Sequence, residues 1–104
     1  MAWLTLILSG VLEAVWAAAL SESEGFTRPL PTVVFAVALT ASMAGLAYAM
    51  RTLPVGTAYA VWVGIGAVGA ALYGIVVAGE SASAARLVCL ALIVAGVAGL
   101  GFLE

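Results

Sequence analysis

The chain consists of four long, mainly apolar stretches separated by short polar segments. The apolar stretches lie near residues 2–20, 31–50, 55–78 and 84–103. A helix needs about 20 mainly apolar residues to cross a lipid bilayer. Four such crossings use nearly all of the 104 residues. The pattern therefore predicts an all-α membrane protein, with four transmembrane helices in a single transmembrane domain over residues 1–104.

The polar segments contain residues that end and begin helices. Segment 21–31 closes with two prolines, which are tolerated at a helix start. Segment 51–54 is so short that the helices on either side of it must be antiparallel neighbours. In the third segment, Gly79 is placed to end one helix, and Ser81 or Ser83 is placed to cap the next.

Composition excludes most other classes of protein. Charged residues make up 8% of the chain and hydrophobic residues 66%, whereas a soluble domain has about a quarter charged and about half apolar residues. Soluble, disordered and nucleic-acid-binding proteins are therefore excluded. Cys89 is the only cysteine, so a disulfide scaffold is excluded too. The sequence has no histidine, no metal-ligand cluster and no phosphate loop. We expect no enzyme, no metal and no cofactor, and a proton gradient as the energy source.

Seven of the eight charged residues lie at or near predicted helix ends. Arg28 and Arg86 belong to loops on one side of the membrane, and Arg51 to the other side. Two arginines against one is a small bias under the positive-inside rule. The sequence therefore leaves the orientation open, and insertion both ways is physically plausible.

Glu13 is the one charged residue in the middle of a predicted helix. A charge at the bilayer centre costs about 2.5–3.5 kcal/mol on insertion scales, and ionisable residues there usually mark ion or substrate pathways. Removal from water favours the protonated acid, so we expect Glu13 to exchange protons closer to neutral pH than an exposed glutamate. The alternative is a permanently protonated, structural glutamic acid. We favour a functional site, where a proton and a cation exchange.

Four polar or aromatic side chains lie deeper in the predicted helices than an interface belt would. They are Trp16, Ser42, Tyr59 and Trp62. Ser9 and Trp16 share a helix face with Glu13. Tyr59 and Trp62 share a face of the third helix. Their N–H and O–H groups need partners away from water, and Glu13 and Ser42 are candidates. The set predicts a polar pocket with aromatic walls, which suits a small flat or greasy cation.

Two glycines, Gly64 and Gly66, lie close together in the middle of the third helix. Such a pair weakens a helix and favours a hinge. The alternative is that each glycine lets another helix approach. Small residues four apart, such as Ala95 and Gly99, predict close helix packing in a bundle or an oligomer.

Three segments stand out, namely residues 9–16 (SGVLEAVW), 25–28 (GFTR) and 53–67 (LPVGTAYAVWVGIGA). Together they resemble one known family, the small multidrug resistance transporters. Trp16 and the run from Gly64 to Ala67 are similar to its guanidinium-exporting branch. The chain departs from the family at Ser21, where lysine is usual, at Val63, in its acidic first loop and near its C-terminus.

The resemblance implies an antiparallel homodimer, although some members of the family form heterodimers. In the antiparallel homodimer, the fourth helix would make the main dimer contact and the first three helices would line the substrate chamber. Two copies of Glu13 would share one site and bind protons or guanidinium alternately. Trp16 and Ser42 would hold the glutamates by hydrogen bonds, Tyr59 would help to switch access, and Trp62 would line the pocket.

Our hypothesis is a proton-coupled antiporter that exports guanidinium, and small guanidinyl compounds, across the inner membrane. Gly64 and Gly66 are its proposed hinge. The second hypothesis is an exporter of hydrophobic quaternary ammonium compounds, with the same mechanism. The third is a membrane subunit that transports nothing itself. Comparing guanidinium with tetraalkylammonium transport distinguishes the first two, and absence of substrate-dependent proton movement favours the third.

Overall fold

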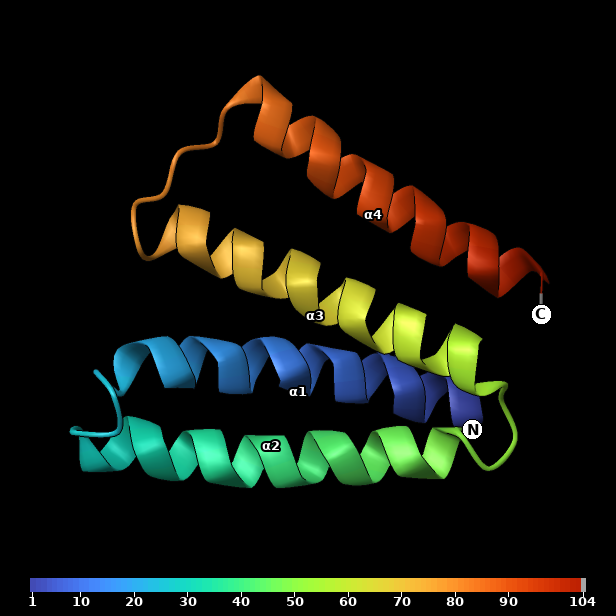
Figure 1. Cartoon of the computed structure of the whole chain (residues 1–104), viewed down its shortest axis with the longest axis horizontal. Coiled ribbons are helices and arrows are strands. Elements are labelled where there is room, and N and C mark those ends of the chain that lie inside the picture. The colour runs from blue at the N-terminus through green and yellow to red at the C-terminus, as the bar shows by residue number, and fades with distance from the viewer. Residues whose placement is uncertain (104) are drawn as a thin grey trace.

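The computed structural model describes residues 1–103, which form four helices (Figure 1). The helices are α1 (Ala2–Glu22), α2 (Pro29–Ala49), α3 (Val55–Val76) and α4 (Ala84–Leu103). Each is long and apolar enough to cross a membrane. The prediction of an all-α protein with four transmembrane helices is confirmed.

The first connection is shorter than the sequence predicted. Helix α1 continues to Glu22, two residues beyond its predicted end, and Ser23 is its C-cap. The Ser23 hydroxyl donates to the Leu20 carbonyl at 2.7 Å and accepts the Phe26 N–H at 3.1 Å. Helix α2 begins two residues early, at Pro29. A proline at the first helical position loses no hydrogen bond, so the helix starts as soon as the chain allows.

The other two connections contain the helix-ending and helix-starting residues that the sequence indicated. Pro54 directly precedes α3. Helix α3 ends at Val76, two residues earlier than predicted, and Gly79 turns the chain with a positive φ of 73°. The Ser83 hydroxyl accepts the Arg86 N–H at 3.2 Å, as an N-cap does for the third residue of a helix. The structure thus selects Ser83 from the two serines proposed as caps.

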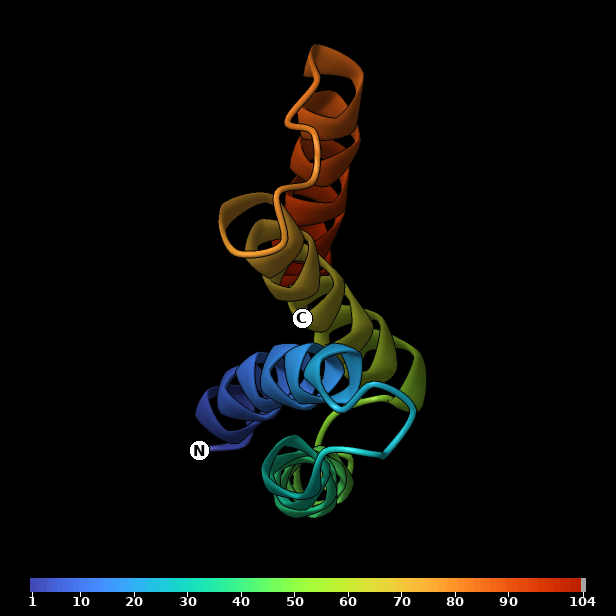
Figure 2. The ribbon, with the colours of Figure 1, turned by 90° about the vertical axis from the view of Figure 1, so that its left-hand side faces the viewer.

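The four helices lie side by side in almost a single layer, in the spatial order α2, α1, α3, α4. Helix α1 packs between α2 and α3, and α3 alone carries α4. Figure 1 shows this order across the molecule, and Figure 2 shows the same helices from the end. The principal extents are 40 × 34 × 16 Å, and one helix with its side chains is about 10–12 Å across. Each helix therefore leaves much of its surface uncovered.

The buried core belongs to α1, α2 and α3. Its residues are Leu6, Leu46, Ala49, Ala58, Val61 and Trp62. None of the described residues of α4 is buried. The described chain is therefore a packed three-helix unit with a fourth helix attached to one side.

Candidate functional site

Glu13 lies midway along α1, on the side that faces α3. Its carboxyl group rests on the α3 backbone at Gly66, which is buried. A Cβ atom at Gly66 would overlap the Glu13 carboxyl group. The neighbouring contacts are also close, since a Cβ at Gly69 would meet Ala14 at 2.6 Å and one at Gly10 would meet Ile65 at 2.8 Å. Glycines on both helices therefore let the acid lie directly against the α3 backbone.

Two buried polar atoms at this level make no hydrogen bond within residues 1–103. They are Oε1 of Glu13, an acceptor when ionised, and Nε1 of Trp16, a donor. Buried polar atoms in proteins are nearly always paired. In the described residues, both ion pairs lie at helix ends, so no arginine neutralises Glu13. The acid therefore keeps the capacity to accept a hydrogen bond from a cation.

A buried hydrogen-bond chain joins α1, α2 and α3 beside the acid. Nε1 of Trp62 donates to Oγ of Ser42 at 3.0 Å, and this hydroxyl donates to the Ser9 carbonyl at 2.7 Å. Ser42 is fully buried and Trp62 nearly so. Ser9 is four residues before Glu13, so it lies one helical turn away on the same face. These hydrogen bonds fix the three helices against one another next to Glu13.

Tyr59 lies at the edge of this set rather than inside it. Its ring contacts the Trp62 ring, with 5.6 Å between centroids and 35° between planes. About half of Tyr59 is exposed, and it lines an apolar groove of about 640 Å³ between α3 and α4. Tyr59 therefore connects the buried Trp62 to the open side of α3.

The hydrogen bonds that the resemblance implied at Glu13 are not formed within residues 1–103. Within residues 1–103, Ser42 makes its bonds to Ser9 and Trp62, and Nε1 of Trp16 has no partner. The Ser42 hydroxyl has one proton, and the Ser9 carbonyl accepts it. The Trp16 ring contacts Phe35 edge to face, at 5.9 Å. The structure thus joins Ser42 to Trp62 by a hydrogen bond and Trp62 to Tyr59 by ring contact, whereas Trp16 contacts Phe35 and Glu13 rests on Gly66.

Gly64 and Gly66 face different helices. A Cβ at Gly64 would overlap the side chain of Val97 on α4, whereas one at Gly66 would overlap Glu13 on α1. Helix α3 runs unbroken through both positions. The alternative that each glycine admits a neighbouring helix is thus seen directly, and the hinge stays a proposal.

One polar contact between helices was missed by the sequence reasoning. The Tyr73 hydroxyl donates to a carboxylate oxygen of Glu22 at 2.5 Å, and Arg28 pairs with the same carboxylate at 3.6 Å. Tyr73 and Glu22 are 51 residues apart, so spacing offered no signal. The contact ties the end of α1 to α3 and gives one acidic residue of the first loop a structural partner.

Four membrane-length helices with an acid at mid-membrane define a small multi-pass membrane protein with an acidic site. In residues 1–103, no group of three potential metal-ligating side chains occurs. The model of the family described as Small Multidrug Resistance protein matches residues 1–93. The chain belongs to this family.

Relatives with assigned names match nearly the whole chain. A protein of Citrobacter freundii called guanidinium exporter is 59% identical over 100 residues, which cover 96% of this chain and 95% of that protein. One of Yersinia pseudotuberculosis with the same name is 57% identical and covers 96% of both chains. These relatives are named as exporters and not as enzymes.

Proposed function

We propose that this protein exports guanidinium across the inner membrane in exchange for protons. The observation that carries the proposal is the Glu13 carboxyl group, held against Gly66 at mid-membrane with a buried oxygen that no donor of residues 1–103 satisfies. The name shared by relatives 57–59% identical to the chain supports the choice of substrate.

The chemistry of the acid suits this exchange. Guanidinium is flat and presents N–H donors that match carboxylate oxygens in pairs. An ionised Glu13 attracts this cation, whereas a protonated Glu13 does not. Binding of a proton and binding of guanidinium are therefore mutually exclusive. This exclusion couples outward movement of the cation to inward movement of protons.

The shape of the protomer supports an antiparallel homodimer as the working unit. The layer is thin, and α4 exposes an apolar surface along its length. Helix pairing in lipid depends on small residues that permit close packing, and α4 has Ala95 and Gly99 four residues apart. In such a dimer, α4 packs on a second copy and two Glu13 residues share one site.

The remaining site residues have distinct roles in this proposal. Trp62 and Trp16 wall the pocket, and Ser42 holds Trp62 in place. Tyr59, at the edge of the pocket, changes position as access switches between the two sides. Bending of α3 at Gly64 and Gly66 accompanies the switch, since both glycines lie at helix contacts that must slide.

Proton movement in proteoliposomes tests the function. We expect a guanidinium gradient to drive opposite proton flux in the wild-type protein, and Glu13→Gln to abolish it. Glu24→Gln is the matched control, because Glu24 is exposed in the first loop, and it should retain wild-type flux. Proton flux driven by tetraethylammonium but not by guanidinium would identify a quaternary ammonium exporter. Flux with neither cation would favour a subunit that does not transport.

A further inference from the structure

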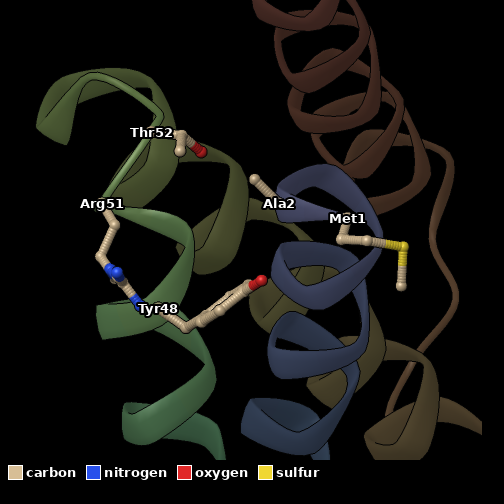
Figure 3. A pocket seen from close by; sticks show the side chains of 5 residues that line it. All are labelled: Met1, Ala2, Tyr48, Arg51 and Thr52. Carbon is tan, nitrogen blue, oxygen red and sulfur yellow. The ribbon is translucent and has the colours of Figure 1, made fainter.

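A polar cavity away from Glu13 lies where α1 begins and α2 ends. It has a volume of about 420 Å³. Figure 3 shows the lining side chains, which come from the start of α1, the last turn of α2 and the loop that follows. They are Met1, Ala2, Tyr48, Arg51 and Thr52. The cavity is at the end of two membrane-length helices, which is the depth of lipid headgroups.

Arg51 differs from the other arginines of the chain. In residues 1–103, the ion pairs join Arg28 to Glu22 and Arg86 to Glu80. The Arg51 guanidinium instead lies 5.8 Å from the centre of the Tyr48 ring. No carboxylate lines the cavity, and the first turn of α1 has no acidic residue. The cavity therefore combines the Arg51 charge, which no lining carboxylate compensates, with two hydroxyl groups, those of Tyr48 and Thr52.

An apolar stripe on α1 begins beside this cavity. Its side chains are Leu4, Leu8, Val11 and Val15, each between 41% and 56% exposed. At 100° per residue, they share a face with Met1, which lines the cavity, and lie opposite the face of Glu13. The stripe thus runs from the cavity towards mid-membrane on the side away from the acid, as the chain of a bound lipid would.

We propose that this cavity binds the phosphate group of an anionic phospholipid. Arg51 supplies the charge and the bidentate donors, and the hydroxyl groups of Tyr48 and Thr52 add hydrogen bonds. An acyl chain of the same lipid lies along the α1 stripe. A soluble phosphate ion would use the same polar groups but not the stripe, so the stripe favours the lipid as occupant.

Native mass spectrometry of the full chain with added lipid tests the proposal. The purified protein is mixed with equal amounts of phosphatidylglycerol and phosphatidylcholine of identical acyl chains. Wild type should retain phosphatidylglycerol preferentially, and Arg51→Gln should lower that adduct about fivefold, the effect of one basic residue at a membrane surface. Arg86→Gln, which removes an exposed arginine at the opposite end, should bind as wild type does.

Three outcomes would overturn the proposal. Equal retention of the two lipids by wild type excludes recognition of the anionic headgroup. Unchanged phosphatidylglycerol binding in Arg51→Gln excludes this cavity. Full displacement of the lipid by millimolar inorganic phosphate assigns the cavity to a soluble anion. The readout needs no transport, so it is independent of the proposed exchange at Glu13.

Discussion

Helices α1 and α4 are both apolar and of nearly equal length, yet α1 is packed on two sides and α4 on only one. Helix α1 lies between two neighbours, and its Gly10 sits where a Cβ atom would meet Ile65 at 2.8 Å. Helix α4 touches only α3, and its glycines Gly96, Gly99 and Gly101 face open space. Small residues permit close helix approach in lipid. Gly10 permits such an approach between α1 and α3, whereas a Cβ at any of the three α4 glycines would meet no atom of residues 1–103 within 4 Å.

The comparison separates two roles for small residues. In the α1–α3 contact they set the position of the Glu13 carboxyl group, so substitution there should alter the site. On α4 they should affect only association with a second copy. Two substitutions distinguish these roles and a third tests the buried hydrogen bonds beside the site, in order from the largest expected effect to the smallest.

Gly66→Ala should have the largest effect, on guanidinium binding. The added methyl group would overlap the Glu13 carboxyl group and force it or α3 to move. Overpacking of this kind costs about 1–3 kcal/mol, or about 5-fold to 150-fold in affinity if it falls on the bound state. Titration calorimetry with guanidinium measures the change.

Gly56→Ala is the matched control for that variant. Gly56 lies on the same helix, and a Cβ there would meet no atom within 4 Å. This variant should bind guanidinium as wild type does. If both alanine variants bind normally, the carboxyl group does not depend on contact with Gly66.

Gly99→Leu on α4 should weaken dimers about tenfold, which corresponds to about 1.4 kcal/mol. A large side chain would keep the two copies apart, since α4 packs on the partner through Ala95 and Gly99 in the proposed dimer. Dimer dissociation in dilute detergent, followed by fluorescence energy transfer, measures this change. Wild-type dissociation would show that this face of α4 lies outside the interface.

Ser42→Ala should produce the smallest effect, a loss of about 0.6 kcal/mol in unfolding free energy, with about 1.7 kcal/mol as the upper end for hydrogen bonds in membranes. The variant removes the hydroxyl that joins Trp62 to Ser9. Unfolding in mixed micelles measures the loss. The control is Thr40→Val, because the exposed Thr40 hydroxyl bonds only within α2, to Ala36. Equal stability losses in the two variants would contradict a structural role for the buried hydrogen bonds that join Trp62, Ser42 and Ser9.

Much of the fold was predictable because charges are costly in lipid. Their spacing placed the four helices to within about two residues, as at Glu22 and Val76. The depth of Glu13 and the face that it shares with Trp16 also followed from the sequence. These predictions use only position along one helix, which the regular geometry of a helix fixes.

Contacts between helices were not predictable in the same way. Ser42 donates to a backbone carbonyl, that of Ser9, and every residue has such a group. Tyr73 meets Glu22 because α1 packs against α3, and no sequence spacing encodes that contact. The direction of Gly66 towards Glu13 depends on how α3 is rotated against α1. These features arise from packing, so they needed the structure.

The most direct test of the account is proton release on guanidinium binding. The purified protein is titrated with guanidinium in weakly buffered detergent solution across the pH range around neutrality. We predict that wild type releases protons as it binds, and that affinity falls about tenfold per pH unit towards acid for each proton displaced. Glu13→Gln should release none. Guanidinium binding that releases no protons and has the same affinity at every pH would contradict a shared site at Glu13.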